Sequence, residues 1–96
     1  MITVRGHESG SMEGKVALVT GSASGIGRAT ALAFAERGAG VALADIDSDG
    51  AHETLCLIQQ KGGEAVFVRA DVSRAVEVEA MIGEVVRSFG GLDYAF

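Results

Sequence analysis

The sequence predicts an α/β fold in which helices cover both faces of a doubly wound parallel sheet. Segments with strand and helix patterns alternate along the chain, as is typical of parallel sheets. A glycine-rich turn joins the first strand to the first helix, and an acidic residue ends the second strand. These observations predict the strand order 3-2-1-4, with the sheet truncated after the start of the fourth strand.

Each expected strand is a short apolar run bounded by glycine or polar residues. The runs cover residues 15–20, 40–44 and 65–70, and a fourth begins at Leu92 and stops at Phe96. Apolar runs of this kind suit a parallel sheet that is buried on both faces.

Between the strands, apolar residues recur at helical spacing over residues 25–37, 48–61 and 74–89. Glycines follow the first two helices, and Ser73 is the expected N-cap of the third. The third helix has the clearest amphipathic pattern. Its apolar stripe consists of Val78, Met81, Ile82, Val85, Val86 and Phe89.

Composition narrows the classes of partner. The 96 residues suit one small domain, and 48% of them are apolar, so a packed core is expected. A net charge of −5 and 5% aromatic residues argue against nucleic acid and against an anionic membrane surface as partners. No stretch has the length of a transmembrane helix. Cys56 is the single cysteine, and with no signal-peptide pattern we expect a cytoplasmic location.

The turn after the first strand has the pattern expected of a phosphate-binding loop. Gly21 suits a sharp bend with positive φ, Gly25 lets the backbone approach a pyrophosphate, and Gly27 allows the helix to pack closely. The N-terminus of the helix supplies unpaired N–H groups and a partial positive charge. The hydroxyls of Ser22 and Ser24 are candidates to donate to phosphate oxygens.

Two other phosphate motifs do not fit this turn. The spacing differs from the strict Gly-x-Gly-x-x-Gly pattern, and Arg28 and Ala29 stand where a P-loop would carry its lysine and serine or threonine. A plain turn is the competing interpretation. The preceding strand, the following helix and the acid after the second strand favour phosphate binding.

The chain resembles the short-chain dehydrogenase/reductase family, whose signature Thr-Gly-x-x-x-Gly-x-Gly is matched by Thr20-Gly21-Ser22-Ala23-Ser24-Gly25-Ile26-Gly27. The resemblance continues in Gly14-Lys15-Val16-Ala17-Leu18-Val19, Ala70-Asp71-Val72 and Gly91-Leu92-Asp93-Tyr94. It implies a Rossmann-type NAD-binding domain over residues 12–96, preceded by a flexible extension over residues 1–11. It also implies that the cofactor is held by Gly21, Ser22, Ser24, Gly25, Ile26 and Gly27.

Asp45 ends the second strand, close to the spacing expected for an acid that binds a ribose 2′-OH. A carboxylate there repels a 2′-phosphate, so it favours NAD over NADP. The family resemblance adds that NADP-preferring relatives often carry a basic residue in the turn or after the second strand, where this chain has Ala23, Ser24 and Ile46. The alternative is that Asp45 caps the second helix, for which Asp47 competes.

Asp71 and Val72 follow the third strand and resemble the pair that contacts adenine in the family. Ile46 is expected to form an apolar wall beside the adenosine. Asp71 could instead cap the third helix, a role compatible with adenine binding. Arg28 is expected on the solvent face of the first helix rather than on phosphate.

The family resemblance further implies catalysis by a Ser, a Tyr and a Lys, the last two spaced Tyr-x-x-x-Lys. Here Tyr94 is the single tyrosine, and it falls inside the fourth strand, where packing is its expected role. Catalytic residues are therefore not assigned, and no metal-ligand spacing is present either. The helices that usually form the family's homo-oligomer interface would also lie beyond this sequence.

Three interpretations remain open. The first is the amino-terminal, NAD(H)-binding portion of an oxidoreductase that acts on an alcohol or carbonyl and is inactive without the remainder. The second is a short product, either a non-catalytic dinucleotide-binding module or an inert truncated chain. The third is an unrelated nucleotide-binding regulator of Rossmann type, which requires the motifs to coincide by chance.

Overall fold

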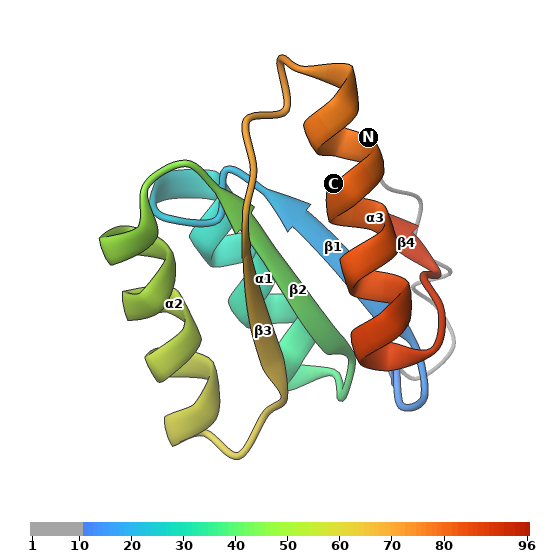
Figure 1. Cartoon of the computed structure of the whole chain (residues 1–96). Coiled ribbons are helices and arrows are strands. Elements are labelled where there is room, and N and C mark those ends of the chain that lie inside the picture. The colour runs from blue at the N-terminus through green and yellow to red at the C-terminus, as the bar shows by residue number, and fades with distance from the viewer. Residues whose placement is uncertain (1–10) are drawn as a thin grey trace.

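A computed structural model describes residues 11–96, in which strands and helices alternate from end to end (Figure 1). The strands are β1 (Val16–Thr20), β2 (Gly40–Asp45), β3 (Ala65–Arg69) and β4 (Tyr94–Ala95). The helices are α1 (Gly25–Glu36), α2 (Ser48–Gln60) and α3 (Ala75–Phe89). The expected helix and strand alternation is therefore confirmed.

The strands form one parallel sheet with the order β3-β2-β1-β4, as predicted. Leu43 of β2 lies at the centre, opposite Val19 of β1 and Phe67 of β3. The order reverses between β1 and β4, so the chain crosses from β3 back over the sheet. In open α/β sheets, ligands bind outside the carboxyl ends of the strands near such a reversal.

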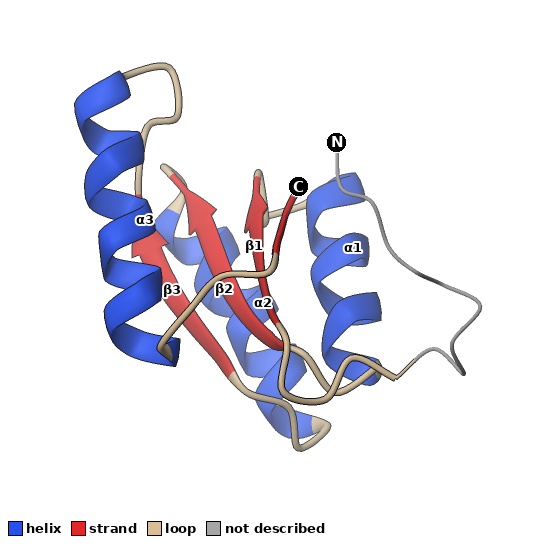
Figure 2. Cartoon of the chain, turned by 90° about the vertical axis from the view of Figure 1, so that its right-hand side faces the viewer, coloured by secondary structure: helices blue, strands red, loops and turns tan. Residues whose placement is uncertain are grey.

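The helices lie on opposite faces of the sheet, with α1 and α2 on one face and α3 on the other (Figure 2). Two apolar clusters fill the spaces between these layers. The α1 and α2 side is packed with residues such as Val19, Leu43, Phe34 and Ile58. The α3 side is packed with residues such as Leu18, Ala42, Met81 and Val85. Apolar side chains thus cover both faces of the sheet, which accounts for the continuous apolar strands.

The fourth strand begins later than expected, at Tyr94 instead of Leu92. The Val16 N–H donates to a carboxylate oxygen of Asp93 at 2.8 Å, and a side chain there takes the place of a backbone acceptor. Regular pairing starts one residue further on, where Tyr94 lies opposite Ala17. Tyr94 packs against the α1 and α2 cluster, as its predicted packing role requires.

The predicted N-cap of α3 is wrong. The cap is Arg74, and it makes no side-chain cap hydrogen bond. Ser73 lies one residue earlier, and its hydroxyl donates to Asp71 at 2.6 Å. The Ser73 hydroxyl therefore forms its hydrogen bond within the β3–α3 loop and does not bond to the end of the helix.

The amino end of the described chain joins the core. Met12 is buried, and its N–H donates to the Arg37 carbonyl at 2.7 Å. The predicted extension over residues 1–11 falls almost entirely outside the described residues, which begin at Ser11. Within residues 11–96, none of the helices is long and apolar enough to cross a bilayer.

Helix α1 approaches the end of β1 so closely that Gly27 has no room for a side chain. A Cβ added to Gly27 would lie 1.9 Å from the Gly21 carbonyl oxygen. By contrast, a Cβ added to Gly83 of α3 would lie 3.6 Å from the flexible end of Arg87, an ordinary contact.

We predict that Gly27→Ala lowers the free energy of unfolding by about 2–3 kcal/mol, because the backbone must move to admit the methyl group. Gly83→Ala is the matched control, and it should raise stability by about 0.5–1 kcal/mol through the helix preference of alanine. Urea unfolding followed by circular dichroism measures both. If both substitutions changed the free energy of unfolding by the same amount, the close approach at Gly27 would be contradicted.

Candidate cofactor-binding site

The glycine-rich turn has the backbone conformation that its sequence predicts. Gly21 and Gly25 have φ values of +66° and +59°, in the left-handed region that favours glycine. Ser24 precedes α1 as its N-cap, in an extended conformation and without a side-chain cap hydrogen bond. The first N–H groups of α1 thus lack the usual side-chain acceptor, which suits them to an anion.

The predicted site residues of the turn divide into an outer and an inner set. Ser24, Gly25 and Ile26 are exposed, with Ile26 75% exposed. Ser22 and Gly27 are buried beneath them. The exposed side chain of Ile26 is thus available for contact with a ligand.

The predicted role of the Ser22 hydroxyl needs correction. Ser22 is fully buried, and its hydroxyl donates inward to the Ala44 carbonyl at 3.3 Å. It therefore joins the turn to β2 and faces away from the surface where a phosphate would lie. Sequence alone does not reveal this orientation, because both serines of the turn have the same short polar side chain.

Asp45 ends β2 beside the glycine turn. One carboxylate oxygen accepts from the Ala23 N–H at 3.0 Å, and the other accepts from the Asp47 N–H at 2.9 Å. Asp47 is the N-cap of α2 and accepts from the Gly50 N–H. The alternative in which Asp45 caps α2 is thus not observed, and its carboxylate instead orients the turn.

A hollow of about 160 Å³ lies between the glycine turn and the ends of β2 and β3. It brings together predicted residues from three separate segments, and Ile46 and Val72 at its edge are half or more exposed. Its lining consists of Gly21, Ala44, Asp45, Ile46, Ala70, Asp71 and Val72. The hollow lies at the carboxyl edge of the sheet, on the β2 and β3 side of the glycine turn.

A larger hollow of about 310 Å³ lies elsewhere. It is formed by the carboxyl ends of α1 and α2 and by the segments that precede β2 and β3, so it sits at the amino edge of the sheet. An exposed ion pair between Lys61 and Glu36, 3.3 Å apart, lies at this hollow. It holds none of the predicted site residues and lacks the glycine turn's N–H groups, so size alone does not identify the site.

Asp71 is fixed in the loop after β3. A carboxylate oxygen accepts from both the hydroxyl and the N–H of Ser73, at 2.6 and 3.0 Å. These two bonds favour the charged carboxylate and lower its pKa, with a smaller contribution from the nearby Arg74. The Asp71 N–H in turn donates to Glu77 of α3 at 2.9 Å. Asp71 is therefore a charged acceptor at the hollow and does not cap α3.

Arg28 is not on the solvent face of α1, contrary to the prediction. Its side chain crosses to α2 and is 25% exposed. The guanidinium contacts Thr54 of α2, which is fully buried. Sequence reasoning missed Thr54 altogether. The available signal is the helical period, which places this hydroxyl on the same buried face as Ala51 and Ile58.

The sequence model of the short chain dehydrogenase family matches residues 15–95, nearly all of the described chain. The chain belongs to the short-chain dehydrogenase/reductase family. Members of this family are oxidoreductases that use nicotinamide dinucleotide cofactors. The glycine turn, Asp45 and Asp71 all lie within the matched residues.

Curated relatives in the short-chain dehydrogenase/reductase family match over the same region. An uncharacterized oxidoreductase from Thermotoga maritima is 47% identical over 81 residues, which is 84% of this chain and 32% of the relative. A 2,5-dichloro-2,5-cyclohexadiene-1,4-diol dehydrogenase from Sphingobium indicum is 44% identical, with the same coverage of 84% and 32%. The chain therefore spans about a third of the length of these relatives.

Solved structures of family members have the same fold. A dehydrogenase/reductase from Sinorhizobium meliloti aligns with a TM-score of 0.86 at 44% identity, over 88% of this chain and 34% of that one. A short-chain type dehydrogenase/reductase from Mycobacterium marinum aligns with a TM-score of 0.87 at 37% identity, over 94% and 36%. The Rossmann-type sheet predicted from the sequence is thus confirmed.

The described residues offer no grouping of three or more His, Cys, Asp or Glu side chains suited to a metal ion. The chemistry available at the hollow is that of the backbone N–H groups and of the carboxylates of Asp45 and Asp71.

We predict that Ser73→Ala raises the pKa of the Asp71 carboxyl toward its ordinary value, because the substitution removes the larger of the hydrogen bonds that favour the charge. Because folding lowers this pKa, the carboxylate's contribution to stability is present above the unfolded pKa and is lost as pH falls through the folded pKa. The free energy of unfolding of the Ser73→Ala variant should therefore change less with pH in the acidic range than that of the wild type.

Carbon-13 NMR titration of the Asp71 carboxyl measures the effect. Ser88→Ala, an exposed serine near the end of α3, is the control and should leave the titration unchanged. An Asp71 titration that is the same in Ser73→Ala and in the wild type would contradict the assigned cause.

Proposed function

We propose that this chain is the amino-terminal, NAD(H)-binding portion of a short-chain dehydrogenase/reductase that transfers hydride between the cofactor and an alcohol or carbonyl. The observation that carries the proposal is the hollow bounded by the glycine turn, Asp45 and Asp71. These groups match, in order, the chemical needs of a diphosphate, a ribose hydroxyl and an adenine amino group.

The diphosphate is proposed to lie on the outer surface of the turn. Ser24, Gly25 and Ile26 are exposed there, and Gly25 begins α1. The partial positive charge of a helix N-terminus and its unpaired N–H groups favour an anion at this position. The Ser24 hydroxyl, which makes no cap hydrogen bond, is a further donor. Buried Ser22 supports the turn from behind instead.

The adenosine is proposed to fill the hollow itself. Exposed Ile46 and Val72 flank it and would cover the faces of the base. Asp71 would accept from the adenine amino group, and its lowered pKa keeps the carboxylate charged. The backbone of Val72 would add a neighbouring contact.

Asp45 supports NAD over NADP as the cofactor. Its carboxylate ends β2 and lines the hollow, where a ribose 2′-OH can donate to it. The Ala23 and Asp47 N–H groups hold the two carboxylate oxygens in place, and each oxygen retains lone pairs for a ribose hydroxyl. A 2′-phosphate at this position would meet a fixed negative charge.

NAD supplies the hydride-accepting nicotinamide when it is bound, and this chain's residues bind and orient its adenosine diphosphate half. By family resemblance, the proton transfer belongs to a Ser, Tyr and Lys outside these 96 residues. Tyr94 packs against the core, so it is not offered as the catalytic tyrosine. The competing proposal is a dinucleotide-binding module without catalysis, and it predicts the same cofactor binding by this chain.

We predict that Asp45→Asn weakens NADH binding roughly tenfold, since a hydrogen bond to a charged acceptor contributes about 1.5–3 kcal/mol. NADPH binding should weaken less or improve, because the repelling charge is gone. The ratio of the two affinities therefore falls. Nicotinamide fluorescence titration of the purified chain measures both constants.

Asp49→Asn is the matched control, because it removes the same charge from an exposed position in the first turn of α2. It should leave the ratio of NADH to NADPH affinity unchanged. If the wild-type chain bound NADPH as tightly as NADH, the assignment of Asp45 to the ribose would be wrong.

A further inference from the structure

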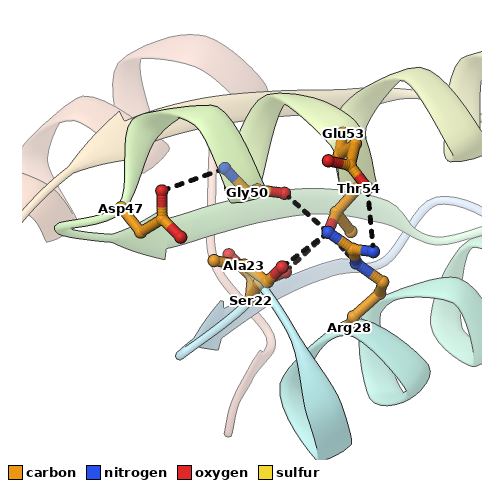
Figure 3. Close-up of polar contacts among 7 residues, drawn as sticks. All are labelled: Ser22, Ala23, Arg28, Asp47, Gly50, Glu53 and Thr54. Carbon is orange, nitrogen blue, oxygen red and sulfur yellow. Dashed lines mark hydrogen bonds and ion pairs between the residues drawn. The ribbon is translucent and has the colours of Figure 1, made fainter.

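We propose that Arg28 and Thr54 act as positioning residues that hold the glycine turn in its phosphate-binding conformation. This inference rests on the proposed function and adds to it a network behind the turn (Figure 3). Neither side chain is proposed to touch the cofactor. Their role is to fix which way the peptide groups of the turn face.

The side chains of the network donate hydrogen bonds to consecutive carbonyl groups of the turn. Thr54 Oγ1 donates to the Ser22 carbonyl at 2.7 Å, and Arg28 Nη2 donates to the Ala23 carbonyl at 2.6 Å. Arg28 Nη2 also reaches the Gly50 carbonyl in α2 at 3.0 Å. Two side chains thus join the turn, α1 and the first turns of α2.

Because each peptide group is planar and trans, fixing the direction of its carbonyl also fixes the direction of its N–H. In a trans peptide the C=O and the N–H point in opposite directions. With the Ser22 carbonyl held by Thr54, the Ala23 N–H points to Asp45, which accepts it at 3.0 Å. With the Ala23 carbonyl held by Arg28, the Ser24 N–H points away from the network, toward the exposed surface of Ser24 and Gly25.

Arg28 and Thr54 depend on one another. Arg28 Nε donates to Thr54 Oγ1 at 2.9 Å, so the hydroxyl accepts from Arg28 while it donates to Ser22. Thr54 is fully buried, whereas Glu53, the other side-chain partner of Arg28 at 3.3 Å, is 72% exposed. The buried bonds therefore fix the guanidinium, and the exposed ion pair with Glu53 contributes little.

The geometry requires arginine and not merely a positive charge. The planar guanidinium presents donors in several fixed directions, and here they serve Thr54, Ala23 and Gly50 together. A lysine ammonium is a compact charge on a flexible stem and does not reproduce this fork. The space is also closed, since a Cβ on Gly50 would lie 2.8 Å from the Ala23 Cβ. Arg28 consequently has a role that charge alone cannot fill.

The test compares ADP with adenosine as probes of the 96-residue chain, using equilibrium dialysis of radiolabelled ligand. ADP uses the turn and the hollow, whereas adenosine uses the hollow alone. We expect Arg28→Lys to weaken ADP binding roughly tenfold and adenosine binding less than twofold, since the turn loses its fork of hydrogen bonds. The ratio of the two affinities is independent of any change in the folded fraction, because unfolding removes both sites equally.

A second pair of variants tests Thr54 in the same way. Thr54→Val keeps the shape and removes the hydroxyl, and it should lower the ratio of ADP to adenosine affinity as Arg28→Lys does. Thr54→Ser restores the hydroxyl and should return the ratio to the wild-type value. Arg87→Lys on α3, an exposed arginine paired with Glu84, is the control and should change neither affinity.

The possible failures are distinguishable. If wild-type protein binds ADP and the Arg28→Lys ratio equals the wild-type ratio, the positioning role is overturned while the proposed function stands. A proportional loss of both ligands would show that Arg28 supports folding only, and would also overturn it. If the wild-type chain binds neither ligand, the proposed function fails and this inference fails with it.

Discussion

The structure depends on the close approach between α1 and the end of β1, where the Gly21 carbonyl lies against Gly27. Any side chain at Gly27 would separate the helix from the strand and enlarge the turn between them. The next two carbonyls along the turn also face inward, toward Thr54 and Arg28. Because these acceptors are satisfied inside the fold, the outer side of the turn is left with donors. The packed interior behind the turn thus leaves its N–H groups directed outward, where we propose that an anion binds.

The parallel sheet makes a single site from distant segments. Carboxyl ends of neighbouring parallel strands lie at one edge, so Asp45 and Asp71 are brought to the same hollow as Gly21. Asp45 has two tasks there, because it lines the hollow and also holds the Ala23 N–H of the turn. The family match over residues 15–95 places this arrangement in the short-chain dehydrogenase/reductase family.

Periodicity and glycine spacing were sufficient to predict the sheet order and the layers, because these follow from local patterns and from the handedness of crossovers. Details that depend on a distant partner were not predictable. The carboxylate of Asp93 delays the fourth strand, and the Ala44 carbonyl draws the Ser22 hydroxyl inward. The pairing of Arg28 with Thr54, 26 positions away, follows no sequence period and was missed. The choice of Asp45 for ribose recognition remains a prediction.

We propose that the outer N–H groups of the glycine turn hold the diphosphate of the cofactor. Mapping amide chemical shifts of the nitrogen-15-labelled chain during titration with NAD tests it most directly. We expect the largest shifts at Ser24, Gly25 and Ile26, with smaller ones at Ile46 and Val72. Shifts concentrated at Gly62 and Gly63, beside the larger hollow at the opposite edge of the sheet, would contradict it.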